Sequence, residues 1–144
     1  MGRRLAIVLG VVAFLAVSAL VARWLATDGT ERAKIERLLS AQGRGDVGAM
    51  AAELDACDAT CRTRLGELTD RLARRGALKI VRYDSKTARS LGDKTAFTRV
   101  VWQLPGALPT VQCVTVRRTG GVLRGFRVRL LRLSAPIARE GACS

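Results

Sequence analysis

The chain has 144 residues, of which 25 are basic and 12 are acidic, and it contains no histidine. This length allows one domain of ordinary size with a short appendage. Without histidine the chain lacks the commonest general base at neutral pH and the commonest metal ligand, so we expect neither a metal nor another cofactor. The formal net charge of +13 favours anionic partners, although an ordinary solvated basic surface would explain it equally well.

An apolar segment begins the chain. An uncharged run extends from Leu5 to Ala22 and follows two arginines. As a helix this run would measure about 27 Å, which is close to the roughly 30 Å of hydrocarbon in a bilayer. We predict that residues 1–26 form a transmembrane anchor or uncleaved signal, and that residues 27–144 form an extracytoplasmic α+β domain. A cleaved leader, which would give a secreted protein, is the alternative.

The first helix of the domain is predicted to begin at Asp28, with Glu31 completing a capping box. Apolar residues then recur at helical spacing at Ile35, Leu38 and Leu39. Two glycines in the sequence QGRG favour a turn and end this helix.

The tripeptide Arg44-Gly45-Asp46 at this turn has the composition of an adhesion signal. An adhesion motif requires an exposed and flexible loop, whereas here an apolar helical pattern follows at once. We therefore interpret the tripeptide as a junction in which Asp46 caps a second helix. The apolar face of that second helix is formed by Val47, Met50 and Leu54.

A third helix is predicted for about residues 60–75, and Gly76 ends it. Its inward residues are Leu65, Leu68 and Leu72. Beyond it the apolar period changes from 3.6 to 2, which indicates strands. The four predicted strands are residues 77–87, 94–104, 110–118 and 122–133. Short breaks of turn-forming residues separate them, so an antiparallel meander is expected.

Tight hairpins would give this sheet one apolar face toward the helices and one solvated face. The apolar face would contain Val100, Trp102, Leu104, Val114, Val116, Phe126, Val128 and Leu130. The predicted pocket-lining residues are Tyr83, Val100, Trp102, Val114, Val116, Phe126 and Val128. The solvated face would contain Arg99, Gln103, Cys113, Thr115, Arg117, Arg127 and Arg129. A slip of one residue in the register would exchange the two faces.

Four cysteines follow the apolar segment, namely Cys57, Cys61, Cys113 and Cys143. An even number in an exported domain predicts disulfides, and three pairings are possible. We favour Cys57–Cys61 as a local link and Cys113–Cys143 as a link that holds the tail. The first link needs an irregular helix start, because residues i and i+4 of a helix lie near the upper distance limit for a disulfide. Free thiols in a cytosolic domain are the alternative.

The order of these elements resembles that of the nuclear transport factor 2-like superfamily, and most closely its small exported or membrane-anchored SnoaL-like members. The resemblance covers residues 30–133 and rests on KIERLLSAQGRGDVGAMAAEL and LGDKTAFTRVVWQL. It implies three helices packed on a curled four-strand sheet, with a cone-shaped pocket between them. Enzymes of this superfamily use a His–Asp pair or acidic residues as general base. Here Asp84 is predicted to face outward and Asp93 lies in a turn, so no base carries over and catalysis is not expected.

These features predict a non-catalytic binding or scaffold module that the lipid bilayer holds through the N-terminal helix and that binds a protein partner or an apolar ligand. The alternative is an anion-binding module for phospholipid or cell-wall phosphate, formed by Arg99, Arg117, Arg127 and Arg129. A small-molecule isomerase or hydrolase is a further alternative. Nucleic acid is not an expected partner, because that face offers few aromatic side chains on which bases stack. The resemblance also implies a homodimer through the open face of the sheet.

Overall fold

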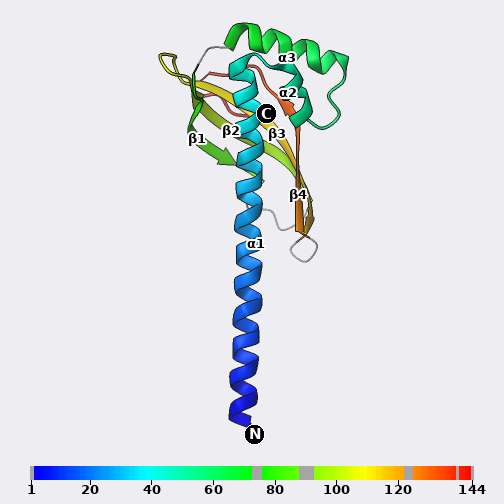
Figure 1. The fold of residues 1–144 in the computed structure, drawn as a ribbon, viewed down its shortest axis with the longest axis vertical. Coiled ribbons are helices and arrows are strands. Elements are labelled where there is room, and N and C mark those ends of the chain that lie inside the picture. Colours follow the sequence, from blue (N-terminus) through cyan, green and yellow to red (C-terminus); the bar gives the residue numbers. More distant parts are fainter. Residues whose placement is uncertain (1, 73–75, 88–92, 122–124, 139, 144) are drawn as a thin grey trace.

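The computed structural model describes residues 2–72, 76–87, 93–121, 125–138 and 140–143. Within these residues the chain forms an α+β fold of three helices followed by four strands (Figure 1). The helices are α1 (Gly2–Arg44), α2 (Val47–Glu53) and α3 (Ala59–Leu72). The strands are β1 (Lys79–Ser85), β2 (Lys94–Gln103), β3 (Thr110–Gly121) and β4 (Gly125–Leu133). The predicted ends at residues 73–75 and 122–124 lie outside the described residues.

Helix α1 is a single helix of 43 residues, so the prediction of a separate helix that begins at Asp28 is wrong. The segment around Thr27, Asp28 and Gly29 contains weak helix formers, but a glycine costs only about 1 kcal/mol and does not interrupt a helix that good helix formers flank on both sides. The N-terminal half of α1 projects from the domain, and its C-terminal half packs within it (Figure 1). The projecting stretch Arg4–Ala22 is exposed, and it is long and apolar enough to cross a bilayer, a test that signal sequences also pass.

The sheet is an antiparallel meander in the order β1-β2-β3-β4, as the short breaks predicted. In the register, Val100 lies opposite Gln112 and Val114 lies opposite Leu133, so the predicted apolar face is correct. Seven of its residues are buried, namely Val100, Trp102, Leu104, Val114, Val116, Val128 and Leu130, and Phe126 is half-buried. Register shifts lie between Ile80 and Arg82 and between Thr115 and Val116.

The helices cover the apolar face of the sheet and complete the core. Ile35, Leu38 and Leu39 of α1 are fully buried there, together with Met50 of α2 and Leu65 of α3. The α1–α2 junction has the predicted cap, because the Asp46 carboxylate accepts a hydrogen bond of 2.9 Å from the amide of Ala49. Gly45 takes a φ of 75° there, a conformation that suits glycine. The Arg-Gly-Asp tripeptide is therefore a helix junction.

Both favoured disulfides are formed, Cys57–Cys61 and Cys113–Cys143. Cys57 precedes α3 and Cys61 lies in its first turn, which gives the irregular start that this pair requires.

The C-terminal tail continues beside β3 where β4 ends, and Ile137 forms a bridge to Val111. Cys113 was predicted on the solvated face, but it is buried, since the tail is linked to it by Cys143 and by a hydrogen bond from the Ser134 amide.

Candidate functional site

A buried carboxylate lies at the end of the domain from which α1 emerges. The side chain of Glu31 in α1 is fully buried, together with the guanidinium of Arg118 from β3. The carboxylate accepts hydrogen bonds from four hydroxyl groups and pairs with one guanidinium. The donors to Oε1 are Tyr83 (2.8 Å), Ser85 (2.8 Å) and Thr98 (2.6 Å), and those to Oε2 are Thr87 (2.5 Å) and Arg118 (3.3 Å). We call these six residues the Glu31 cluster.

Two effects on the pKa of Glu31 oppose each other. Burial raises the pKa of the carboxyl group, but the hydrogen bonds from Thr87, Thr98, Ser85 and Tyr83 together hold the pKa below its ordinary value of 4.5. The group is therefore ionised at neutral pH, and both of its oxygens already accept hydrogen bonds. A general base works best with a pKa near the operating pH, so this carboxylate is suited to joining α1 to the strands and is poorly suited to removing protons.

Glu31 was predicted to complete a capping box, and this prediction is wrong because Glu31 lies inside α1 with its side chain fully buried. Two patterns in the sequence indicated the ion pair between Glu31 and Arg118. Glu31, Ile35 and Leu38 follow each other at helical spacing, so Glu31 belongs to the buried face of α1. Arg118 follows Val114 and Val116 at period 2, so its side chain is directed inward, where a guanidinium requires an anion.

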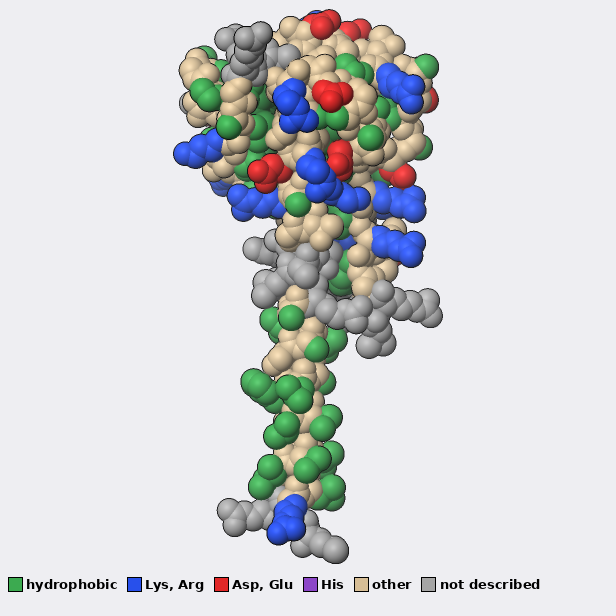
Figure 2. All heavy atoms as spheres, viewed as in Figure 1, with side chains coloured by type: hydrophobic (Ala, Val, Ile, Leu, Met, Phe, Trp, Pro, Cys, Tyr) green, Lys and Arg blue, Asp and Glu red, His purple; other side chains and the backbone are tan. Residues whose placement is uncertain are grey.

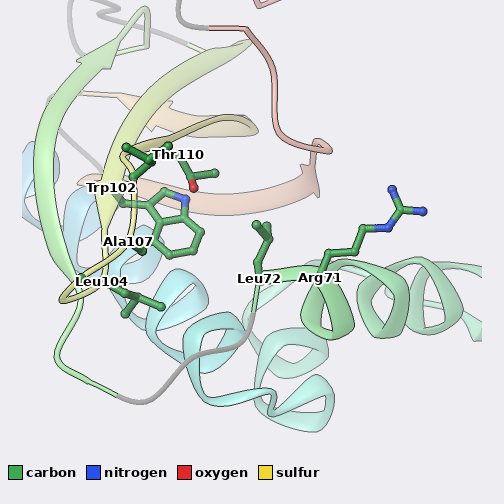
Figure 3. Close-up of a pocket in the computed structure, with 8 residues that line it drawn as sticks. Arg71, Leu72, Trp102, Leu104, Ala107 and Thr110 are labelled. Atoms are coloured by element: carbon green, nitrogen blue, oxygen red, sulfur yellow. The ribbon is translucent and has the colours of Figure 1, made fainter.

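A cavity of about 340 Å³ lies at the opposite end of the domain, between the end of α3 and the connection from β2 to β3. The cavity is lined by Arg71, Leu72, Trp102, Leu104, Gly106, Ala107, Leu108 and Thr110. Figure 3 shows Leu72 directed toward the Trp102 ring and Arg71 directed away from it. The indole nitrogen of Trp102 donates to Oε1 of Gln112 at 2.7 Å, which fixes the ring in place. We call this feature the distal cavity.

The predicted pocket residues are distributed between these two regions. Trp102 lines the distal cavity, and Val100, Val114, Val116 and Val128 lie in the buried core. Tyr83 belongs to the Glu31 cluster, and Phe126 lies 5.7 Å from the guanidinium of Arg118. The binding of a ligand by these seven residues stays a prediction. The residues of the cavity rim were missed, although the sequence PGALP, with a leucine between turn formers, indicated an exposed apolar loop.

The four predicted anion-binding arginines do not form one row. Arg117 of β3 lies opposite Arg129 of β4, and Arg127 lies opposite Thr119, so these three arginines are close neighbours. Arg99 lies farther along the sheet, half-buried. Its cross-strand neighbours are Asp84 on one side and Cys113 on the other. The structure therefore brings together three of the four arginines.

In the described part of the chain, no group of three acidic or cysteine side chains is placed to hold a metal ion. Comparison with protein-family models, with curated proteins and with solved structures finds no match for this chain.

Proposed function

We propose that the protein is a non-catalytic binding or scaffold module that α1 anchors in the cytoplasmic membrane, with the domain outside the cytoplasm. The observation that carries this proposal is the continuity of α1. Its first half is exposed and apolar over Arg4–Ala22, and its second half supplies Ile35, Leu38 and Leu39 to the domain core. Nineteen exposed residues of this kind are costly in water, and a bilayer removes that cost.

The disulfides support the location of the domain. Such links persist in oxidising compartments and are rare in the cytosol, where thiols are kept reduced. All four cysteines are paired, and none is free. A domain with this pairing is suited to the outer side of the membrane.

The distal cavity supports the proposed binding role. Its volume lies at the lower end of the range of about 300–1,000 Å³ that is usual for ligand pockets, so a small apolar ligand or several apolar side chains of a partner would fill it. Leu108 at its edge is 85% exposed, so it adds apolar surface to the rim of the cavity. The cavity lies at the end of the domain away from the apolar half of α1, where a partner has access (Figure 1).

The proposed family is the nuclear transport factor 2-like superfamily, and the proposed shape is a cone of helices against the sheet. Support comes from the element order of three helices and then a four-strand meander. The saturated carboxylate of Glu31 favours a member without catalysis, because its hydrogen bonds keep the pKa of the carboxyl group low.

Thiol labelling in intact cells tests the location. We expect an alkylating reagent that cannot cross the membrane to leave all four cysteines unlabelled before reduction and to label them afterwards. We also expect the full-length chain to stay with the membrane after washing at alkaline pH. Labelling without reduction would contradict the location, and recovery of the chain in the soluble fraction would contradict the anchor.

Site-specific photocrosslinking tests the cavity. A photoreactive amino acid at position 108 should give one discrete crosslinked product in native membranes. The same probe at Val81, which is an exposed apolar residue of β1, should not give that product. The variant Ala107→Arg, which fills the cavity, should abolish the product, and equal crosslinking from both positions would contradict a binding role for the cavity.

A further inference from the structure

Three arginines gather on the outer face of the β3–β4 hairpin, near the ends of these strands. Arg117 faces Arg129 across the ladder, and Arg127 faces Thr119 one step nearer the turn. Directly opposed side chains in an antiparallel pair lie about 5 Å apart and diagonal neighbours about 7–8 Å apart. The three guanidinium groups therefore form one small basic surface, which we call the basal arginine patch.

Within the basal arginine patch the charges are compensated unequally. Arg129 pairs with Asp55 at 3.1 Å, and the neighbouring Arg118 is directed inward to Glu31. Arg117 and Arg127 are exposed, and among the described residues neither takes part in an ion pair. Two positive charges without an ion-pair partner repel each other at this spacing, and an anion placed between them would relieve that repulsion.

The height of the patch above the apolar stretch is set by α1. Glu31 lies nine residues beyond Ala22, so it stands roughly 13 Å above the end of that stretch. Arg118 contacts Glu31, and β3 continues from there to Gly121, beside α1 and in the direction of its apolar half (Figure 1). Because Arg127 pairs with Thr119, it lies closer to the apolar half than Glu31 does.

In Figure 2 many lysine and arginine side chains surround the end of the domain from which α1 emerges. With Arg4–Ala22 in the hydrocarbon, this end meets the lipid headgroups. Arg127 would then lie within about one Debye length, roughly 8–10 Å, of the phosphate layer.

We propose that Arg117 and Arg127 bind the headgroups of anionic phospholipids in the membrane that α1 spans. This inference rests on the proposed anchor. Guanidinium groups bind phosphate through two parallel hydrogen bonds, and a second attachment beside the helix would fix the rotation of the whole molecule about the axis of α1. An acidic protein partner would not explain why the exposed pair lies on the hairpin ends that descend toward the apolar stretch.

The test uses the full-length chain in bilayers of phosphatidylcholine that contain a trace of spin-labelled phosphatidylglycerol or spin-labelled phosphatidylcholine. Electron paramagnetic resonance resolves the lipids that the protein immobilises, and the ratio of the two association constants gives the selectivity for the anionic lipid. An arginine near an anionic surface contributes up to about a fivefold preference, so we expect a selectivity of severalfold for the native chain. We expect R117S/R127S to lower it at least threefold, and R117K/R127K to retain only part of it, because lysine keeps the charge but not the two parallel hydrogen bonds.

The matched control is R62S/R64S, which removes the same charge from exposed positions of α3. Helix α3 lies at the end of the domain away from the apolar half of α1 (Figure 1), so this control should leave the selectivity unchanged. An equal fall in selectivity in both serine variants, or no fall in either of them, would overturn the proposal. The absence of any immobilised lipid would instead overturn the anchor itself, so the two failures can be told apart.

Discussion

The two ends of the domain interior are built from different interactions. At the end where α1 emerges, the Glu31 cluster joins α1 to β1, β2 and β3 through hydrogen bonds and an ion pair. At the other end, apolar side chains surround the distal cavity, and Leu108 is largely exposed. Directional contacts fix one end in a single arrangement, whereas the other end has space for an additional group.

The Glu31 cluster and the distal cavity therefore have different roles in the domain. A buried ion pair adds little net stability compared with apolar packing, but the removal of one partner is costly, so such a pair fixes a unique arrangement. We therefore expect the Glu31 cluster to fix the rotation of α1 against the sheet. The distal cavity is lined mainly by apolar side chains, which suits a surface that accepts a partner.

The largest expected effect comes from breaking the Glu31 cluster. In Arg118→Met the carboxylate of Glu31 stays buried without its guanidinium, and we expect the free energy of unfolding to fall by about 3–5 kcal/mol. Chemical denaturation of the full-length chain in detergent measures this loss. The double variant E31Q/R118M should recover part of it, since neither charge remains. The exposed pair Arg37–Glu53 is the control, and Arg37→Ala should cost less than about 1 kcal/mol.

The next largest expected effect is a dependence of the unfolding free energy on pH. The pKa of Glu31 is lower in the folded chain than its ordinary value of 4.5, so its contribution to stability is present above that value and is lost as the pH falls through the lower, folded-state pKa. We therefore expect the native chain to lose more unfolding free energy below pH 4.5 than Glu31→Gln does. Denaturation at a series of pH values measures both slopes, and parallel curves would show that Glu31 does not titrate with folding.

A smaller change, in the stabilising direction, is expected at Gln42. Its side chain is fully buried in α1, and both of its polar atoms lack a hydrogen-bond partner within the described part of the chain. Gln42→Met keeps the volume and removes the unsatisfied amide, so the free energy of unfolding should rise by about 1 kcal/mol. The same denaturation measurement tests this, and a loss of stability would mean that the amide has a partner in the folded protein.

The smallest effect is expected at the distal cavity. Leu108→Ser removes an apolar side chain that is 85% exposed, so stability should change by less than about 0.5 kcal/mol. Under the proposed binding role, the partner contacts this side chain. Co-purification of the partner should therefore fall in L108S, while the denaturation midpoint should not move. A large loss of stability would show that Leu108 serves the fold.

Local patterns predicted much of this fold. The alternation in β2, β3 and β4 gave the faces of the sheet, the cysteine spacing gave both disulfides, and Asp46 was recognised as a cap because its partner amide is only three residues away. These features depend on contacts between near neighbours or on a simple period.

The interactions that were missed join distant parts of the chain. Glu31 and Arg118 are 87 residues apart, and Glu31 had a local interpretation as a capping residue. The continuity of α1 through Gly29 depends on the helical segments on either side of it. A short local motif around Gly29 does not contain this information. The distal cavity is formed where α3 packs near the β2–β3 connection. Sequence patterns do not predict which distant segments pack against each other.

With α1 anchored in the bilayer as proposed, its continuity also makes the domain a lever. Spanning helices lean by about 20° on average, and more when their apolar stretch exceeds the local hydrocarbon thickness. From Ala22 to Arg44 the helix extends about 33 Å, so a lean of this size carries its tip sideways by about 11 Å. A change in bilayer thickness, or a neighbouring protein that pushes on the span, would therefore swing the far end of the domain through an arc.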